Sequence, residues 1–263
     1  MSADVPDHRQ PAASDTSAHT RADGADLILA ALNYLRGSLS PDRNASGSPS
    51  LSRQKEGLRE WAGRLGLLLT PSDLPAKVER GGQEHDIYHD ESTDRYVKVT
   101  RDGIFGLSPG IDLALVSSDM DARRFHLWEA SPMEYLERLH LQNELVPDLN
   151  HLEGVITQED DMAIVSSQPR FELDPVSQPE IDAWFEAQGF VKVTRCGYYR
   201  AEDNLGVFDA HSKNLMRFES TLIPFDVIPC RPGGGFLQFI ADTLAAGHHV
   251  KEVRTVSTSP RGA

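Results

Sequence analysis

Three polar residues in the C-terminal half of the sequence have the types and the spacing that metal-assisted phosphoryl transfer requires. Asp209 ends an apolar run, Asn214 follows five positions later in a polar loop, and Asp226 lies inside the next apolar run, residues 222–228. Phosphoryl transfer needs a carboxylate beside the attacking hydroxyl and hard oxygen ligands for Mg²⁺. The pattern predicts that Asp209 orients the nucleophile, while Asn214 and Asp226 hold the metal.

A hairpin is the simpler interpretation of the same residues, because Asp and Asn are common in turns. The D-x-x-x-x-N spacing does not separate the two interpretations. Asp226 favours chemistry, since a carboxylate buried inside Leu-Ile-Pro-Phe-Asp-Val-Ile would lose its hydration unless it is paired or binds a metal.

Composition indicates a globular protein and excludes several functions. The 263 residues suffice for one large domain or two small ones. A formal net charge of -14, without any cluster of Lys and Arg, argues against a nucleic-acid partner. Cys196 and Cys230 indicate neither a disulfide framework nor a structural zinc site. No apolar stretch is long enough to span a bilayer, so we expect no membrane partner and a reducing, cytoplasmic location.

The elements before the polar loop are read from periodicity and breakers. Residues 1–23 contain almost no large apolar side chains and are expected to be disordered. Helices are predicted at 25–36 and from 51 to 68, where Thr70-Pro71 ends the second, and they form an accessory layer. A flexible linker at 40–50 joins them.

From residue 78 the pattern changes to strands. A glycine turn into a strand is predicted at 79–88 and a second strand at 95–100. They are followed by a loop-like stretch at 101–130, a capped helix at 131–145 and a hairpin over 151–168. A helix at 179–189 and three short strands then lead to Asp209, and a last helix is predicted at 236–246.

Lys98 lies between two valines in the 95–100 strand and has two interpretations. It either points outward from a half-exposed sheet or binds nucleotide phosphates below the Gly81-Gly82 turn. In the second case Glu144, or alternatively Glu137, on the 131–145 helix is its partner. A zinc site at His85 and His89 is disfavoured, because the segment is a predicted strand and lacks the H-E-x-x-H pattern.

The order of these parts resembles the protein-kinase-like fold. More closely, over residues 51 to 232, it resembles the serine/threonine/tyrosine kinase domain found in polyvalent proteins of phages and plasmids. The motifs that carry this resemblance are Gly81-Gly82-Gln83-Glu84-His85, Glu134-Tyr135-Leu136 with Asn143-Glu144, Gln168-Pro169, Phe208-Asp209-Ala210-His211-x-x-Asn214 and Pro224-Phe225-Asp226. The D-x-H-x-x-N loop is also similar to that of aminoglycoside and choline kinases.

The resemblance implies an α+β, two-lobed fold with a reduced C-terminal lobe. Its boundaries are a tail at 1–23, a helical extension at 24–76, an N-lobe at 77–168, a C-lobe at 169–250 and a flexible tail at 251–263. The implied cofactors are ATP and Mg²⁺, and the acceptor is a hydroxyl on a protein or a small molecule. The implied roles are nucleotide binding by Gly81, Gly82, Gln168 and the Lys98–Glu144 ion pair, catalysis by Asp209 with Lys98, and metal binding by Asn214 and Asp226.

The sequence also departs from ordinary protein kinases. Val207-Phe208 replaces the His-Arg pair before Asp209, Val227-Ile228 replaces Phe-Gly after Asp226, and no A-P-E element follows. Activation-loop control and a large peptide-docking lobe are therefore not expected. Three functions remain: an active phosphotransferase, a nucleotide-binding pseudokinase that serves as an interaction module, and a structural domain whose Asp and Asn are turn residues.

Overall fold

A computed structural model describes residues 24–39, 50–78, 84–101, 104–111, 125–158, 161–171 and 174–247, with the backbone of 256–257. The predicted tail at 1–23, nearly all of the 40–50 linker and the Gly81-Gly82 turn lie outside the described residues. So does the predicted C-terminal tail, apart from the short strand β15 (Val256–Ser257). The domain boundaries stay predictions.

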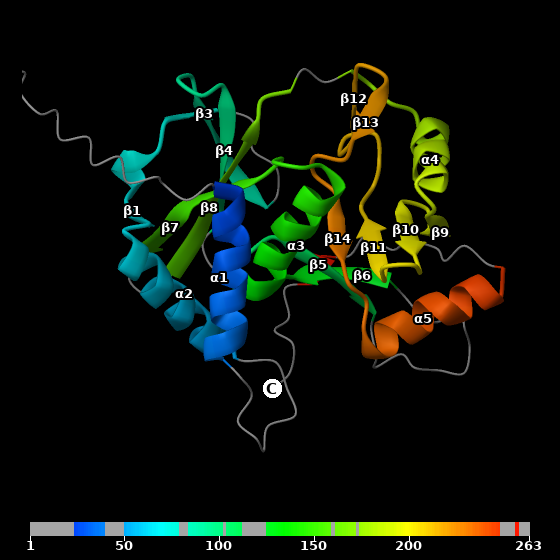
Figure 1. Cartoon of the computed structure of the whole chain (residues 1–263), viewed down its shortest axis with the longest axis horizontal. Coiled ribbons are helices and arrows are strands. Elements are labelled where there is room, and N and C mark those ends of the chain that lie inside the picture. Colours follow the sequence, from blue (N-terminus) through cyan, green and yellow to red (C-terminus); the bar gives the residue numbers. More distant parts are fainter. Residues whose placement is uncertain are drawn as a thin grey trace, which may run out of the picture.

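The described residues form a mixed α+β fold with five α-helices (Figure 1). These are α1 (Gly24–Ser38), α2 (Leu51–Leu65), α3 (Pro132–Leu145), α4 (Gln178–Ala187) and α5 (Gly234–Ala245). Each corresponds to a helix expected from periodicity. Ser131 caps α3 in a capping box with Glu134, and Pro132 occupies its first turn. The helix α2 ends earlier than expected, because Gly66 adopts the left-handed conformation with φ 68°.

A six-stranded sheet supports the first part of the fold. Its strand order is β1 (Leu68–Leu69), β7 (His151–Gln158), β8 (Asp161–Pro169), β4 (Arg95–Thr100), β3 (His85–Asp90) and β2 (Ala76–Lys77). Only the β1–β7 pair is parallel. In the strand β4, Val97 and Val99 join an apolar cluster on one face of the sheet. Because side chains alternate along a strand, Lys98 points to the opposite face.

The opposite face is covered by α1, α2 and α3. Ile28 and Leu32 of α1 and Leu58 of α2 are fully buried against Leu136 of α3 and Ile164 of β8. Figure 1 shows the three helices gathered beside the sheet. The two N-terminal helices therefore belong to the core of this region and do not form an accessory layer. Each helix buries its apolar stripe in the same cluster as α3 and the sheet.

The second part of the fold contains three smaller sheets. The first has the strand order β14 (Ile228–Cys230), β11 (Leu205–Phe208), β10 (Gly197–Arg200) and β9 (Val191–Thr194). The second pairs β12 (Met216–Phe218) with β13 (Thr221–Ile223). The third has the order β15, β6 (Phe125–Glu129) and β5 (Leu107–Ile111). A short 3-10 helix, Pro71–Asp73, lies before β2. None of the helices in the described ranges is long and apolar enough to cross a membrane.

The antiparallel pair β5–β6 corrects the expectation of a loop at 101–130. Pro109 and Gly110 inside β5 are loop signals, but Pro is tolerated at sheet edges. Phe125 of β6 stacks on Phe208 of β11 with ring centroids 4.9 Å apart. The strand pair is thus stabilised by a residue 83 positions away in the chain, counted from 125 to 208, which local sequence cannot reveal.

Candidate functional site

The strand β11 delivers Asp209 to the site. All four residues of β11 are buried, and Asp209 follows them directly. Its backbone has φ 55°, in the left-handed region that Asp and Asn tolerate better than most residues. The next amide, that of Ala210, donates to the carbonyl of Cys196 at 2.9 Å, which fixes the loop to the β9–β10 turn. Asp209 therefore has a defined position although it lies in a loop.

Asn214 joins the two aspartates. Its Nδ2 donates to the Asp209 carbonyl at 2.8 Å and to Asp209 Oδ2 at 2.9 Å. The Asp226 amide donates to the Asn214 carbonyl at 3.2 Å. The three residues predicted from spacing thus lie in one hydrogen-bonded unit. Asp209 is bound by the side-chain nitrogen of Asn214, and Asp226 is bound by its backbone carbonyl.

Lys98 reaches this unit from the six-stranded sheet. Its Nζ lies 3.1 Å from Asp226 Oδ1, although the two residues are 128 positions apart. Lys98 is only 9% exposed, so the interpretation as an outward-pointing surface lysine is wrong. The side chain of Asp226 is 36% exposed and sits where the sheet meets the polar loop.

Arg138 of α3 is a second cation at Asp226, and sequence reasoning missed it. Its NH2 lies 3.5 Å from Asp226 Oδ1, its NH1 lies 2.6 Å from Glu84 Oε2, and its Nε donates to the Val227 carbonyl at 3.2 Å. Arg138 is 3% exposed. Burial alone would raise the pKa of the Asp226 carboxyl, but the charges of Lys98 and Arg138 outweigh it and hold that pKa below its usual range.

The expected pair of Lys98 with Glu144 is not what the structure shows. Glu144 Oε2 lies 2.7 Å from Arg231 NH2, and Glu137, the alternative, lies 2.7 Å from Arg36. The reason is the orientation of α3. Its buried face carries Tyr135, Arg138 and Gln142 at helical spacing, while the two glutamates lie on a partly exposed face. A cation in line with buried apolar positions was the available signal for Arg138.

His85 and Tyr135 form a neutral polar contact beside the charged cluster. His85 Nε2 lies 2.9 Å from the Tyr135 hydroxyl, which lies 3.3 Å from Ser166 Oγ. Burial, helped by the nearby charge of Lys98, lowers the pKa of His85 to about 3. The ring is therefore uncharged at neutral pH. The other histidine of the segment, His89, contacts Asp94 at 3.1 Å.

Gln168 carries a buried polar atom that lacks a partner. It is 4% exposed, and its Oε1 has no hydrogen-bond partner among the described residues. Gln168 pairs with Tyr96 in the β4–β8 ladder, and Ser166 pairs with Lys98. Because residues two apart on a strand share a face, Gln168 lies on the same face of the sheet as Lys98. An unsatisfied buried acceptor is costly unless a ligand completes it.

The polar atoms at Asp226 and Asn214 fit a hard cation such as Mg²⁺. Asp226 Oδ1 takes both cationic contacts, and Asn214 uses its nitrogen, so one carboxylate oxygen and one amide oxygen remain for a metal. Within the described ranges, no group of three or more His, Cys, Asp and Glu side chains could hold a metal ion. Mg²⁺ does not require such a group, because it is commonly held by one or two protein oxygens together with phosphates.

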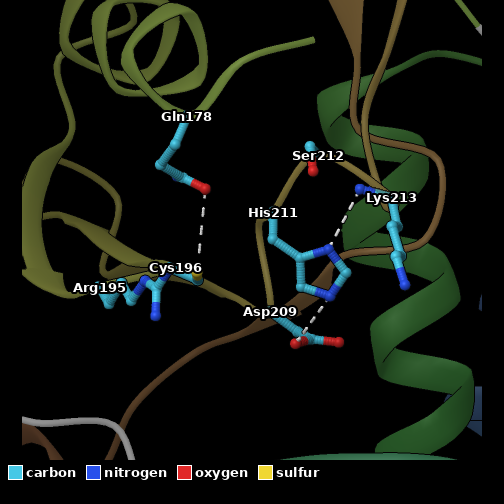
Figure 2. A pocket seen from close by; sticks show the side chains of 7 residues that line it. All are labelled: Gln178, Arg195, Cys196, Asp209, His211, Ser212 and Lys213. Carbon is cyan, nitrogen blue, oxygen red and sulfur yellow. Dashed lines mark hydrogen bonds and ion pairs between the residues drawn. The ribbon is translucent and has the colours of Figure 1, made fainter. Parts of the chain in front are cut away.

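A cavity of about 430 Å³ opens beside Asp209. Figure 2 shows its two walls. One is the polar loop itself, with His211 Nε2 3.5 Å from Asp209 Oδ1, and the other is formed by the start of α4 and the β9–β10 turn. The lining residues are Gln178, Arg195, Cys196, Asp209, His211, Ser212 and Lys213. Asp209 therefore faces a space large enough for a small ligand or a side chain.

Comparison with known proteins addresses the segment that holds most of this site. No curated protein matched the chain. Residues 123–228 match a family described as serine/threonine/tyrosine kinase found in polyvalent proteins. This range is less than half of the chain; it includes Arg138, Gln168, Asp209 and Asp226 but begins after Lys98. The match confirms the resemblance inferred from the sequence: residues 123–228 are similar to the serine/threonine/tyrosine kinase found in polyvalent proteins.

Proposed function

We propose that the chain is an ATP- and Mg²⁺-dependent kinase that transfers the γ-phosphoryl group to a hydroxyl of a protein acceptor. One observation carries the proposal. Lys98 and Asp226 come from distant parts of the chain and meet at 3.1 Å, one backbone hydrogen bond away from the loop that holds Asn214 and Asp209. A hairpin with ordinary turn residues gives no reason for a buried lysine to end there.

In this proposal the nucleotide lies along the face of the six-stranded sheet that carries Lys98. Lys98 and Arg138 bind its phosphates, because both are buried cations that contact the same carboxylate oxygen, Asp226 Oδ1. Arg138 is held in place by its closer contact with Glu84. The unsatisfied Oε1 of Gln168, on the same face, accepts a hydrogen bond from the exocyclic amino group of the base. These residues position the triphosphate and contribute no covalent chemistry.

Asp209 acts on the acceptor. The acceptor oxygen forms a bond to the γ-phosphorus, the bond from that phosphorus to the bridging oxygen of the β-phosphate breaks, and ADP leaves with the electron pair. The hydroxyl proton passes to the Asp209 carboxylate. Asn214 positions that carboxylate by donating a hydrogen bond from Nδ2 to Asp209 Oδ2. Mg²⁺, held by Asp226 and Asn214 when bound, neutralises the charge on the phosphates.

A second function, nucleotide binding without turnover, is favoured by one observation. In ordinary kinases the strand lysine pairs with a helix glutamate, whereas here α3 supplies Arg138 and both cations contact Asp226. If this arrangement persisted with nucleotide bound, Asp226 would be less available to a metal. Turnover and binding must therefore be measured separately.

The decisive experiment measures radiolabelled phosphate transfer from Mg²⁺-ATP to a general protein acceptor, together with nucleotide affinity. Asp209→Asn should keep nucleotide affinity and lower turnover on the order of 10² to 10⁴-fold, because Asn tolerates the left-handed backbone but accepts no proton. Asp226→Asn should weaken Mg²⁺-nucleotide binding and turnover together. The matched control is Asp161→Asn, the same change at an exposed strand position, which should alter neither.

Each outcome has a distinct meaning. Unchanged turnover in Asp209→Asn rejects its catalytic role. Nucleotide binding that depends on Asp226, without transfer in the unmodified chain, selects the binding function. A melting temperature that no nucleotide raises rejects both, since a ligand at a hundredfold excess over its Kd stabilises the folded state by about 2.7 kcal/mol.

A further inference from the structure

The cavity beside Asp209 is separate from the proposed nucleotide side of the site. Asp209 belongs to both, but Lys98, Arg138 and Asp226 do not line the cavity. Its walls come from the polar loop, from α4 and from the β9–β10 turn (Figure 2). A molecule placed there would meet the carboxylate that accepts the hydroxyl proton in the proposed reaction.

The cavity lining carries two cations, Arg195 and Lys213, and one carboxylate, Asp209, the reverse of the balance in the whole chain. The formal net charge is -14, and carboxylates outnumber cations 40 to 26. Cations of nearby elements are paired: Lys192 with Asp182, Arg200 with Asp203. Arg195 lies in the turn between β9 and β10, the strands that carry Lys192 and Arg200. It has no carboxylate partner among the described residues.

Lys213 is the second such cation. It lies in the polar loop, its side chain is exposed, and it too has no carboxylate partner in the described part of the chain. Figure 2 shows Asp209 between Arg195 on one side and Lys213 on the other. Two cations that no described carboxylate pairs, on either side of Asp209, favour an anionic occupant.

The remaining wall is fixed rather than adaptable. Gln178 donates to Asp182, to the Tyr198 hydroxyl and to the Ala210 carbonyl, and it accepts from Cys196 at 3.9 Å. Its side-chain atoms are therefore used in holding α4 against the loop. Arg195 and Lys213 are left as the charged groups able to bind a ligand.

We propose that this cavity is the acceptor subsite and that it selects hydroxyl residues of acidic peptide segments, whose neighbouring carboxylates contact Arg195 and Lys213. The inference rests on the proposed kinase function and names its substrate class. A peptide suits the cavity because Arg195, Ser212 and Lys213 form an exposed rim, so a side chain can enter while its backbone stays outside. Cationic acceptors such as amino sugars are disfavoured by the same charges.

The test uses three peptides that each contain one serine, flanked by Asp, Asn or Lys at otherwise identical positions. We expect kcat/KM to fall in that order, by about two- to fivefold for each change of flanking charge, and less steeply at high salt. Arg195→Glu should remove or reverse the order while leaving Mg²⁺-ADP affinity unchanged. Arg53→Glu on α2 is the matched control, with the same charge change away from the cavity.

Peptide binding, measured by fluorescence anisotropy with and without Mg²⁺-ADP, separates this inference from the kinase function. Transfer without any dependence on flanking charge, or an Arg195→Glu variant that behaves like the parent chain, overturns the acidic subsite and leaves the kinase function intact. Binding of the acidic peptide that Arg195→Glu abolishes, without transfer, supports the subsite and rejects catalysis. Phosphorylation of a small anionic alcohol, such as a free hydroxy acid, in place of any peptide overturns the peptide class, and absence of both binding and transfer overturns both proposals.

Discussion

Replacing Arg138 by Gln should destabilise the fold more than the loss of any surface ion pair. The guanidinium is 3% exposed, and it contacts Glu84, Asp226 and the Val227 carbonyl. The variant leaves the largely buried carboxylate of Glu84, whose side chain is 16% exposed, without its cation. A buried acid that loses its partner keeps its desolvation cost and loses the attraction that offset it.

The expected cost follows from that burial. Removing one partner of a buried ion pair costs about 3–5 kcal/mol. For a protein of this size, each kcal/mol lowers the melting temperature by about 2–4 °C, so the fall should be roughly 6–20 °C. Asp226 keeps its contact with Lys98 at 3.1 Å in the variant. The part of the free-energy cost that comes from Asp226 should therefore be small.

Thermal and urea denaturation at neutral pH measure the effect. Arg200→Gln is the matched control, because Arg200 pairs with Asp203 at 2.8 Å but is more exposed, and its loss should cost about 1 kcal/mol or less. Adding Glu84→Gln to Arg138→Gln should recover part of the loss, since the unpaired charge is then removed. A cost for Arg138→Gln no larger than that of Arg200→Gln would refute the reasoning.

Two further predictions concern stability alone. Because the pKa of His85 is lowered to about 3 in the folded chain while the unfolded chain keeps the ordinary value near 6.5, the unfolded state binds the extra proton between these pH values. The contribution of His85 to the free energy of unfolding is therefore complete above about pH 6.5 and falls by on the order of 1.4 kcal/mol per pH unit below it. In melting curves between pH 7 and pH 5, the stability of His85→Gln should depend less steeply on pH than that of the parent chain. A Cβ at Gly154 would lie 2.4 Å from the Leu67 carbonyl, so Gly154→Ala should cost about 1–3 kcal/mol in urea denaturation without changing nucleotide affinity, and a neutral effect would contradict the close packing.

Local signals were sufficient to predict many elements of the fold. The strand Arg95–Thr100 was expected from its β-branched residues, and the helix α3 from Ser131, Pro132 and Glu134 at its start. Both patterns are complete within a few neighbouring residues. The polar loop was predicted for the same reason, since Asp209 and Asn214 are five positions apart and hydrogen-bond within that short segment.

The charged cluster was beyond local sequence because its members meet only in the tertiary fold. Arg138 and Asp226 are 88 positions apart, and nothing near either residue indicates the other. The Lys98–Glu144 pair was expected from helical spacing and from the resemblance, and neither gives the rotation of α3 about its axis. That rotation is set by burial of Tyr135 and Leu136 against the six-stranded sheet.

The two cations at Asp226 have a consequence for the order in which ligands arrive. With Lys98 and Arg138 both against Asp226 Oδ1, a lone divalent ion meets two cations at the carboxylate that would bind it. A triphosphate supplies the negative charge that draws these side chains toward itself and frees the carboxylate for metal. Under the proposed function, nucleotide and Mg²⁺ therefore raise each other's affinity by the same factor, as linkage requires. The chain is then built to receive its metal as part of the nucleotide complex.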